Sequence, residues 1–414
     1  MTEVAVREGY GGASVARTIA HAGVSRPTFY EHFENKDDCF LAAHAAASEL
    51  LREEILQAVE RERPERALQA VLRALGAFAA SQPTGARFLM EEIMAGGPRA
   101  LDARDTEVVE IAAIVERAFT RLSPDTPTPD LPTSAVIGAL YRLLSQSLRR
   151  NETNLEHLLD SLDVWLDSHA QPTAKHLKRT PTPPVPFPPP PRVSELSLQA
   201  PVALGPGRPS QSEQEVSANH RERLLYATAE VGAQKGFTAT TIADITTAAH
   251  VDRRVFYRHF HDKQEIFLAA HELAFQQTLA VTAAAFFRGE NWPERVWESA
   301  RAFTQFLATH PVLTNIGFVE SNAIGAAAVQ RINDTNAAFT IFLQEGYQHP
   351  QSINHPSPQA LTAIAAMQFE IFYHEFRHGD WTDIPTLLPE ITLICLTPFL
   401  GPEAAAEFVQ SKLA

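Results

Sequence analysis

Cysteine is almost absent from this sequence, and so are the patterns that cysteine usually serves. The 414 residues include only Cys39 and Cys395, far apart and without the short spacing of a metal-binding pair. We therefore expect neither a disulfide framework nor a zinc site, and the composition suits a reducing compartment. The N-terminus has no apolar signal-like segment, and no apolar run is expected to reach membrane-spanning length. A cytoplasmic protein with no membrane partner is predicted.

The sequence also lacks an excess of positive charge. It has 35 Lys and Arg against 49 Asp and Glu, a formal net charge of −14. This balance excludes a protein coated in basic charge, so any contact with DNA must be local. Alternating β-branched residues are missing as well, which argues against a sheet. Apolar residues three to four positions apart predict an all-α fold instead.

Proline is abundant in one place, between Pro172 and Pro209. Consecutive prolines have no backbone donors and a fixed φ, so this stretch cannot join a helix or the core of a sheet. It predicts a semi-rigid linker with no binding role. A docking motif for a proline-reading partner is the alternative.

An internal repeat spans the linker and predicts a tandem duplication. The pentapeptide FLAAH occurs at 40–44 and again at 267–271, and Gly9-Tyr10 matches Gly236-Phe237 at the same offset of 227. Further along the offset becomes 229, where Pro64-Glu65-Arg66 matches Pro293-Glu294-Arg295 and Glu91 lines up with Glu320. We call the two halves copy one and copy two.

The repeat divides the chain into five predicted segments. They are a helix-turn-helix domain with a truncated first helix (1–44), a helical ligand-binding and dimerisation domain (45–170), the linker (171–215), a second helix-turn-helix domain (216–271) and a second helical domain (272–414). Each copy is expected to end in two long apolar helices, roughly 134–149 and 155–169 in copy one, and 359–378 and 384–400 in copy two.

Copy two shows the helix-turn-helix pattern clearly. An amphipathic helix is expected over 220–235, ending at Gly236, and either Thr240 or Thr241 can cap the next helix. Asp252 can cap a third helix over 253–260, whose exposed cations and tyrosine suit a major groove. Arginine reads guanine edges there, while Tyr, His and Lys contact phosphates.

Copy one repeats this pattern in its first 40 residues. Ser14 opens a helix, 22–25 forms the turn, and Ser25 caps a recognition helix over 26–33 in which Pro27 is tolerated in the first turn. The segments 22–40 and 251–267 resemble the signature of the TetR family of transcriptional regulators, and the resemblance covers both copies.

The resemblance implies a three-helix DNA reader, a helical domain for a small-molecule effector, and dimerisation through the last two long helices of each copy. By motif position, it implies DNA contacts by Ser25, Arg26, Thr28, Tyr30, His32 and Lys36 in copy one, and by Thr241, Arg253, Arg254, Tyr257, His259 and Lys263 in copy two.

Several positions depart from the family pattern. Met1 aligns with Thr228, so either the start lies further upstream or copy one folds on a weakened scaffold, and Thr18 stands where an apolar residue is usual. In copy two His250 replaces the turn glycine, which His tolerates better than most residues. Residues 220–263 have seven cations and five anions, whereas residues 1–44 have four and six. We therefore expect copy two to supply more of the phosphate affinity.

The helical domains raise two further questions. Glu91 with Phe88 in copy one, and Glu320 with Phe318 in copy two, could contact a largely apolar effector, although packing is the simpler reading. Residues 374–378 spell H-E-x-x-H, a zinc motif, but copy one has no equivalent and no third ligand is evident. We expect no enzyme, no catalytic residue, no metal and no cofactor.

The sequence therefore predicts a ligand-responsive regulator, by analogy a repressor, that binds a double-stranded DNA operator. Its two copies would pair within one chain as a pseudo-dimer on an imperfect palindrome, with a homodimer of chains as the alternative. The rival function is a small-molecule sensor or interaction protein in which one or both readers are inactive.

Overall fold

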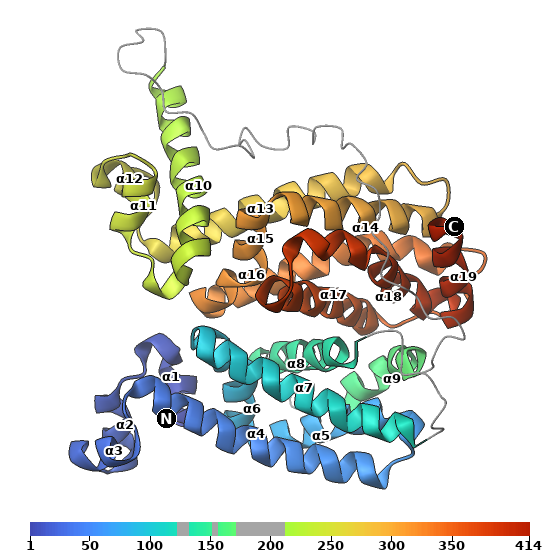
Figure 1. The fold of residues 1–414 in the computed structure, drawn as a ribbon, viewed down its shortest axis with the longest axis horizontal. Coiled ribbons are helices and arrows are strands. Elements are labelled where there is room, and N and C mark those ends of the chain that lie inside the picture. The colour runs from blue at the N-terminus through green and yellow to red at the C-terminus, as the bar shows by residue number, and fades with distance from the viewer. Residues whose placement is uncertain (122–131, 151–155, 171–211) are drawn as a thin grey trace. The chain divides into compact units, whose positions relative to one another are not determined.

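The computed structural model describes residues 1–121, 132–150, 156–170 and 212–414. Within these residues the chain forms α-helices and short 3₁₀ helices, and no strand (Figure 1). The all-α prediction is confirmed. The predicted linker, apart from its last four residues, lies outside the described residues, so its conformation stays a prediction.

The order of helices repeats, as the duplication predicts. Copy one contains α1 (Thr2–Gly12), α2 (Val15–Ala22), α3 (Arg26–His32), α4 (Lys36–Arg61), η1 (Pro64–Arg66), α5 (Ala67–Ser81), α6 (Pro83–Met90), η2 (Glu92–Ala95), α7 (Pro98–Thr120), α8 (Thr133–Arg149) and α9 (Glu156–Ala170). Copy two contains α10 (Glu213–Ala239), α11 (Ile242–Ala248), α12 (Arg253–His259), α13 (Lys263–Phe286), α14 (Trp292–Thr309), α15 (Pro311–Phe318), η3 (Glu320–Ile324), α16 (Ala326–Phe339), η4 (Thr340–Gln348), α17 (Pro358–His378), η5 (Trp381–Leu387), α18 (Leu388–Leu400) and α19 (Pro402–Leu413).

The helices divide into two compact units whose limits do not follow the two copies. Unit 1 combines residues 1–180 with 336–371 and 389–414, and unit 2 combines 181–335 with 372–388. Helices α18, α19 and the first part of α17 therefore belong to the same unit as copy one. Sequence repeat and structural unit are thus different divisions of this chain.

Each unit has its own apolar core. In unit 1, Phe40, Phe78, Phe88 and Trp165 are almost completely buried. In unit 2, Leu224, Ile245, Phe256, Phe260 and Phe267 belong to one buried cluster that joins α10 and the short helices α11 and α12 to α13. Burial of each such side chain stabilises the fold by roughly 1.5–3 kcal/mol. The stability of the reader of copy two therefore comes mainly from its apolar packing on α13.

Glycine ends the first helix of each copy. Gly9 has φ 74° and ψ 158°, and Gly236 has φ 75° and ψ 159°, a backbone region that is open to glycine almost alone. The prediction that the helix stops at Gly236 is confirmed, with one further short turn to Ala239. The helix begins earlier than expected, at Glu213, because Ser212 and Glu215 form a reciprocal capping box.

The C-terminal part of copy two differs from the expected pair of long helices. The stretch expected as one helix over 384–400 is the 3₁₀ helix η5 followed by α18, with Pro385 inside η5, where it provides no backbone donor. Gly401, at φ 80°, then starts the further helix α19, which was not expected.

The expectation that no apolar run reaches membrane-spanning length needs correction. The segment Trp381–Leu400 is long and apolar enough to cross a membrane by length and composition alone. However, 78% of its most apolar 18-residue stretch is buried, as in the core of a folded domain.

The turn before α12 allows a test of backbone strain. His250 has φ 52° and is the one described residue other than glycine with positive φ. A left-handed residue costs roughly 1–2 kcal/mol, whereas a new glycine adds about 0.4–1 kcal/mol of unfolded-state entropy. His250→Gly should therefore leave the stability of α11–α12 unchanged or raise it slightly, as hydrogen exchange of their amides would measure.

His261→Gly is the matched control, since it introduces the same residue at a position where the backbone does not have positive φ. It should lower the protection of the same region. Equal losses in both variants would show that His250 is not strained.

Candidate DNA interface

The recognition helix of copy two, α12, is built to expose cations. The Asp252 carboxylate accepts the backbone N–H of Arg254 at 2.7 Å and so caps the helix, as predicted. Phe256 and Phe260 are buried in the reader's core, which fixes the helix orientation. The opposite face is exposed and displays Arg253, Arg254, Tyr257 and Arg258. The Arg253 guanidinium also donates to the Tyr257 hydroxyl one turn away, at 3.2 Å.

Helix α11 supports α12 from the other side of the turn. Thr241, rather than Thr240, caps it, because the Thr241 hydroxyl accepts the N–H of Asp244 at 3.2 Å and the Asp244 carboxylate accepts the N–H of Thr241 at 3.0 Å. The Arg223 side chain donates to the carbonyl oxygens of Ala249 and His250 at 2.5 and 2.7 Å, which holds the turn. Arg223 is therefore engaged within the reader.

Copy one has the same recognition helix with less positive charge. Ser25 caps α3 by accepting the N–H of Thr28 at 3.2 Å, and Phe29 is buried beneath the helix. Arg26, Tyr30 and His32 are exposed, with Ser25 beside them at the cap. Glu31 is also exposed, at the position that Arg258 occupies in copy two. The two exposed faces thus share a geometry and differ in charge.

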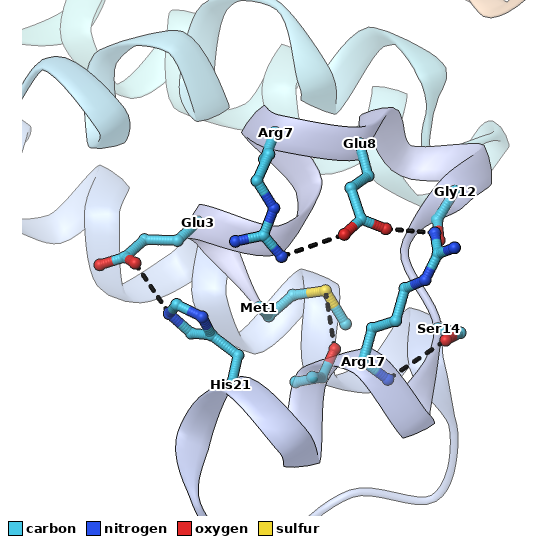
Figure 2. Close-up of polar contacts among 9 residues, drawn as sticks. Met1, Glu3, Arg7, Glu8, Gly12, Ser14, Arg17 and His21 are labelled. Carbon is cyan, nitrogen blue, oxygen red and sulfur yellow. Dashed lines mark hydrogen bonds and ion pairs between the residues drawn. The ribbon is translucent and has the colours of Figure 1, made fainter.

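The shorter first helix of copy one is held to α2 by polar contacts (Figure 2). The Glu8 carboxylate accepts from Arg17 and from Arg7, and Glu3 pairs with His21 at 2.7 Å. Exposed ion pairs of this kind contribute only about 0–1 kcal/mol each. The buried Thr18 hydroxyl lies 4.0 Å from the Met1 sulfur, so a polar group indeed occupies the expected apolar position.

The two lysines predicted to bind phosphate lie against their own reader. The Lys36 ammonium donates to the Tyr10 carbonyl at 3.2 Å and lies 3.7 Å from the centre of the Tyr10 ring. Lys263 donates to the Phe237 carbonyl at 2.7 Å and lies 4.3 Å from the Phe237 ring centre. Burial lowers the pKa of Lys263. A phosphate contact by either lysine would have to share the ammonium with these carbonyls.

The residues predicted to contact an effector have structural partners. Phe88 is buried and packs 4.8 Å from the Phe40 ring, and Phe318 packs 5.7 Å from the Phe372 ring. Glu320 accepts the backbone N–H of Phe237 at 2.5 Å, while Glu91 lies 3.9 Å from the Arg149 guanidinium. An effector contact at these positions stays a prediction.

The structure also corrects the alignment of the two glutamates. Helices α6 and α15 both have eight residues and begin with proline, at Pro83 and Pro311, an offset of 228. This offset pairs Glu320 with Glu92 rather than with Glu91. Glu92 accepts the backbone N–H of Tyr10 at 2.9 Å, the contact that Glu320 makes with Phe237. The paired prolines were the sequence signal that could have found it.

The histidines of the H-E-x-x-H segment lie one turn apart at the end of α17, with ring centres 5.0 Å apart. Across the described ranges, no group of three or more His, Cys, Asp or Glu side chains is placed to hold a metal ion.

A buried ion triad in unit 1 was not predicted. Glu370 on α17 accepts from Arg104 on α7 at 2.6 Å and from Arg142 on α8. Burial by itself would raise the pKa of Glu370, but the two guanidinium groups lower it below the ordinary value. A Cβ on Gly138 would lie within 2.6 Å of Glu370 Cγ, so glycine is needed for this approach. The sequence signal was a charge within an apolar run at Arg142 and at Glu370, whereas Arg104 lies among other charged residues.

A second polar network continues from the triad along α7. The Glu107 carboxylate, one turn after Arg104, lies 2.9 Å from the His44 ring nitrogen and accepts from the Tyr141 hydroxyl. Burial raises the pKa of Tyr141 well above its ordinary value, and the Glu107 charge adds to this. The two networks fix α4, α7, α8 and α17 in one arrangement.

This geometry defines a class: a chain with two three-helix readers, each carried on a helical core. A family model for bacterial regulatory proteins of the tetR family matches residues 2–43 and 224–270, which are the two readers. Both readers therefore belong to the tetR family of bacterial regulatory proteins.

Two solved structures are similar to this chain. A regulatory protein of the tetR family from Rhodococcus RHA1 has 19% identity and a TM-score of 0.37, with 46% of this chain and 98% of that chain covered. A putative TetR-family transcriptional regulator from Syntrophomonas wolfei has 18% identity and a TM-score of 0.36, with 42% and 95% covered. No curated protein matches the chain.

The ion triad predicts a specific dependence of stability on pH. Because the pKa of Glu370 is lowered on folding, its contribution is complete above the ordinary value of 4.5 and is lost as the pH falls through the lower folded value. Glu370→Gln removes the buried carboxylate that Arg104 and Arg142 share, which costs about 3–5 kcal/mol at neutral pH. Urea unfolding from pH 7 to pH 3 should show this difference shrinking in acid.

Glu403→Gln removes an exposed carboxylate on α19 and is the control. It should unfold like the wild type at pH 7. If Glu370→Gln did the same, the triad would not stabilise the fold.

Proposed function

We propose that this regulator reads an operator in double-stranded DNA with two unlike helix-turn-helix readers. The observation that carries the proposal is the exposed face of α12, where Arg253, Arg254 and Arg258 lie together with Tyr257. Arginine can read guanine edges and neutralise phosphates, and tyrosine can donate to a phosphate. With Thr241, His259 and Lys263, these residues would form the DNA surface of copy two.

Copy one would contribute the second, weaker reader. Ser25, Arg26, Thr28, Tyr30, His32 and Lys36 form the equivalent surface, but Glu31 stands where copy two has Arg258. A carboxylate there repels phosphate, so copy two would supply most of the salt-dependent affinity. The same glutamate favours the rival function, a sensor or interaction protein in which the reader of copy one is inactive.

The chain would pair its two copies as an intramolecular pseudo-dimer, and the buried triad supports this. Copy one supplies Arg104 and Arg142, whereas copy two supplies Glu370. If two α8 helices of copy one met in the same way, neither would bring a carboxylate to Arg142, because α8 contains no Asp or Glu. The Ser357 hydroxyl of copy two also donates to the Ser161 carbonyl of copy one at 2.5 Å.

An effector would control DNA binding through the helical cores. Phe88 with Glu91, and Phe318 with Glu320, would meet a largely apolar molecule between the helices of each core. We infer repression, and a cytoplasmic location, from family analogy alone. On such a pseudo-dimer the operator would be an imperfect palindrome, with half-sites about 34–36 Å apart.

DNA reading can be tested with an operator selected from random DNA. Arg253→Ala combined with Arg254→Ala should weaken binding by at least about tenfold in a gel shift and should reduce the slope of affinity against salt, because two phosphate or base contacts are lost. A selected site should contain two unlike half-sites, as the two recognition helices differ.

Arg288→Ala removes one exposed arginine beyond the far end of α13, a helix about 36 Å long at 1.5 Å per residue, and is the control. It should leave affinity nearly unchanged. If no sequence is enriched by the wild type, the rival sensor function is favoured.

The pseudo-dimer can be tested by light scattering at low concentration. The wild type should have the mass of one chain, 45.6 kDa. Gly138→Ala places a methyl group against Glu370 and should loosen the pairing, which would appear as faster hydrogen exchange in α8 and α17. Gly317→Ala, where no atom lies within 4 Å of the new Cβ, is the control. A stable species of twice the mass would contradict intramolecular pairing.

A further inference from the structure

Both copies contain the same joint between reader and core. We define it by the glycine that ends the first helix, the aromatic residue that follows, a glutamate from the core and a lysine from the next long helix. In copy one these are Gly9, Tyr10, Glu92 and Lys36, and in copy two Gly236, Phe237, Glu320 and Lys263.

In each joint, the backbone of the aromatic residue is hydrogen-bonded through both its N–H and its carbonyl oxygen. In copy two the Phe237 N–H donates to Glu320 Oε2 at 2.5 Å, and its carbonyl accepts from Lys263 at 2.7 Å. In copy one the Tyr10 N–H donates to Glu92 Oε2 at 2.9 Å, and its carbonyl accepts from Lys36 at 3.2 Å. A residue held through both its N–H and its carbonyl oxygen cannot rotate without breaking a charged hydrogen bond.

The aromatic ring closes the joint. The Tyr10 ring meets Phe40 edge to face at 4.8 Å, and the Phe237 ring meets Phe267 in the same way at 4.9 Å. The lysine ammonium also lies over each ring, 3.7 Å from the centre of the Tyr10 ring and 4.3 Å from the centre of the Phe237 ring. The two joints therefore agree in backbone angles, polar partners and ring packing, although the surrounding core sequences differ.

The glutamates are costly to place where they are. Burial raises the pKa of Glu320, and the Phe237 N–H and the Arg377 charge offset part of that effect. Burial also raises the pKa of Glu92, against which the Tyr10 N–H acts. An apolar side chain would avoid this cost. Retention of a carboxylate at both joints indicates that the bond to the backbone has a use beyond filling space.

The position of the bond indicates that use. Glu92 and Glu320 are the first residues of η2 and η3, the 3₁₀ turns that follow α6 and α15 in the cores. Their partners lie at the glycine break that leads into α2 and α11, and so to the recognition helices. Apolar residues of the core, among them Leu313, Ile316 and Ile324, also join the buried cluster of the reader in unit 2, and apolar contacts are not directional.

We propose that Glu92 and Glu320 are positioning residues for DNA reading, which fix the direction of each reader on its core through one backbone hydrogen bond. The inference rests on the proposed function, since it concerns how the readers are aimed. Loss of the carboxylate should leave each reader folded but free to tilt about its glycine.

The test compares Glu320→Ala, Glu320→Gln and wild type by hydrogen exchange and by operator affinity. Glu320→Ala should increase amide exchange around Phe237 and weaken operator binding by about tenfold, equivalent to about 1.4 kcal/mol. Glu320→Gln keeps an oxygen that accepts the N–H and should restore affinity to within about threefold. The unfolding midpoint should stay near that of wild type, which a purely structural role would lower.

Glu290→Ala removes an exposed carboxylate of copy two and should change neither readout. Glu92→Ala should increase exchange around Tyr10 and leave Phe237 unchanged. If Glu320→Ala does not fold, Glu320→Asp shortens the side chain by one methylene and should show the same exchange effect. Unchanged exchange at Phe237, or unchanged affinity in a protein that binds its operator, overturns the proposal. If the wild type binds no DNA, only the proposed function is refuted. Hydrogen exchange at Phe237 would still test whether Glu320 holds the joint.

Discussion

The constraint on which unit 1 depends is the burial of one carboxylate. Glu370 lies on α17 in an otherwise apolar stretch and is buried with Arg104 and Arg142. A buried charge without partners costs several kcal/mol, so α7 and α8 must approach α17 at this point. Gly138 permits the approach, because any larger residue would occupy the space of the carboxylate. Geometry and charge thus select the same register of helices.

The same triad bears on the packing of copy one against copy two within unit 1. Replacing such a triad with apolar residues often costs nothing in stability. The triad is therefore better explained by specificity, because it determines which helix surfaces can pack together. Copy two supplies the carboxylate that lies between two guanidinium groups of copy one. A duplicated gene begins with two identical surfaces, and complementary charge is a simple way to make them pair with each other. The proposed pseudo-dimer follows from this complementarity.

The sequence predicted the readers well because their signals are local. Ser25, Thr241 and Asp252 cap helices as expected, since a cap depends on residues two or three positions away. His250 was correctly expected at a positive φ from the missing turn glycine. Contacts between distant residues were not predictable in this way. The triad joins positions 104, 142 and 370, and a charge in an apolar run does not name its partner.

The candidate effector residues show the same limit at closer range. Glu320 was a candidate for ligand contact because its neighbours are apolar, but apolar neighbours describe burial and not the direction of a side chain. Its carboxylate accepts a backbone N–H of the reader, and a contact with an effector stays a prediction. The alignment of Glu91 with Glu320 also failed by one residue, because a single offset was carried across α6 and α15.

The two copies differ at the DNA face and agree at the joint, and this contrast bears on how the regulator works. On the recognition helices, Glu31 and Arg258 have opposite charge at one position, so the half-sites that we propose for the two copies can diverge. At the joint, the φ and ψ angles of the two glycines agree within one degree, and each glutamate accepts the N–H of the residue after its glycine. Base preference can change through one exposed side chain at a time. The direction of a reader depends on several buried groups together, so a change in any one of them disturbs the rest. A regulator built from two copies can therefore acquire an asymmetric operator while each reader keeps the same attachment to its core.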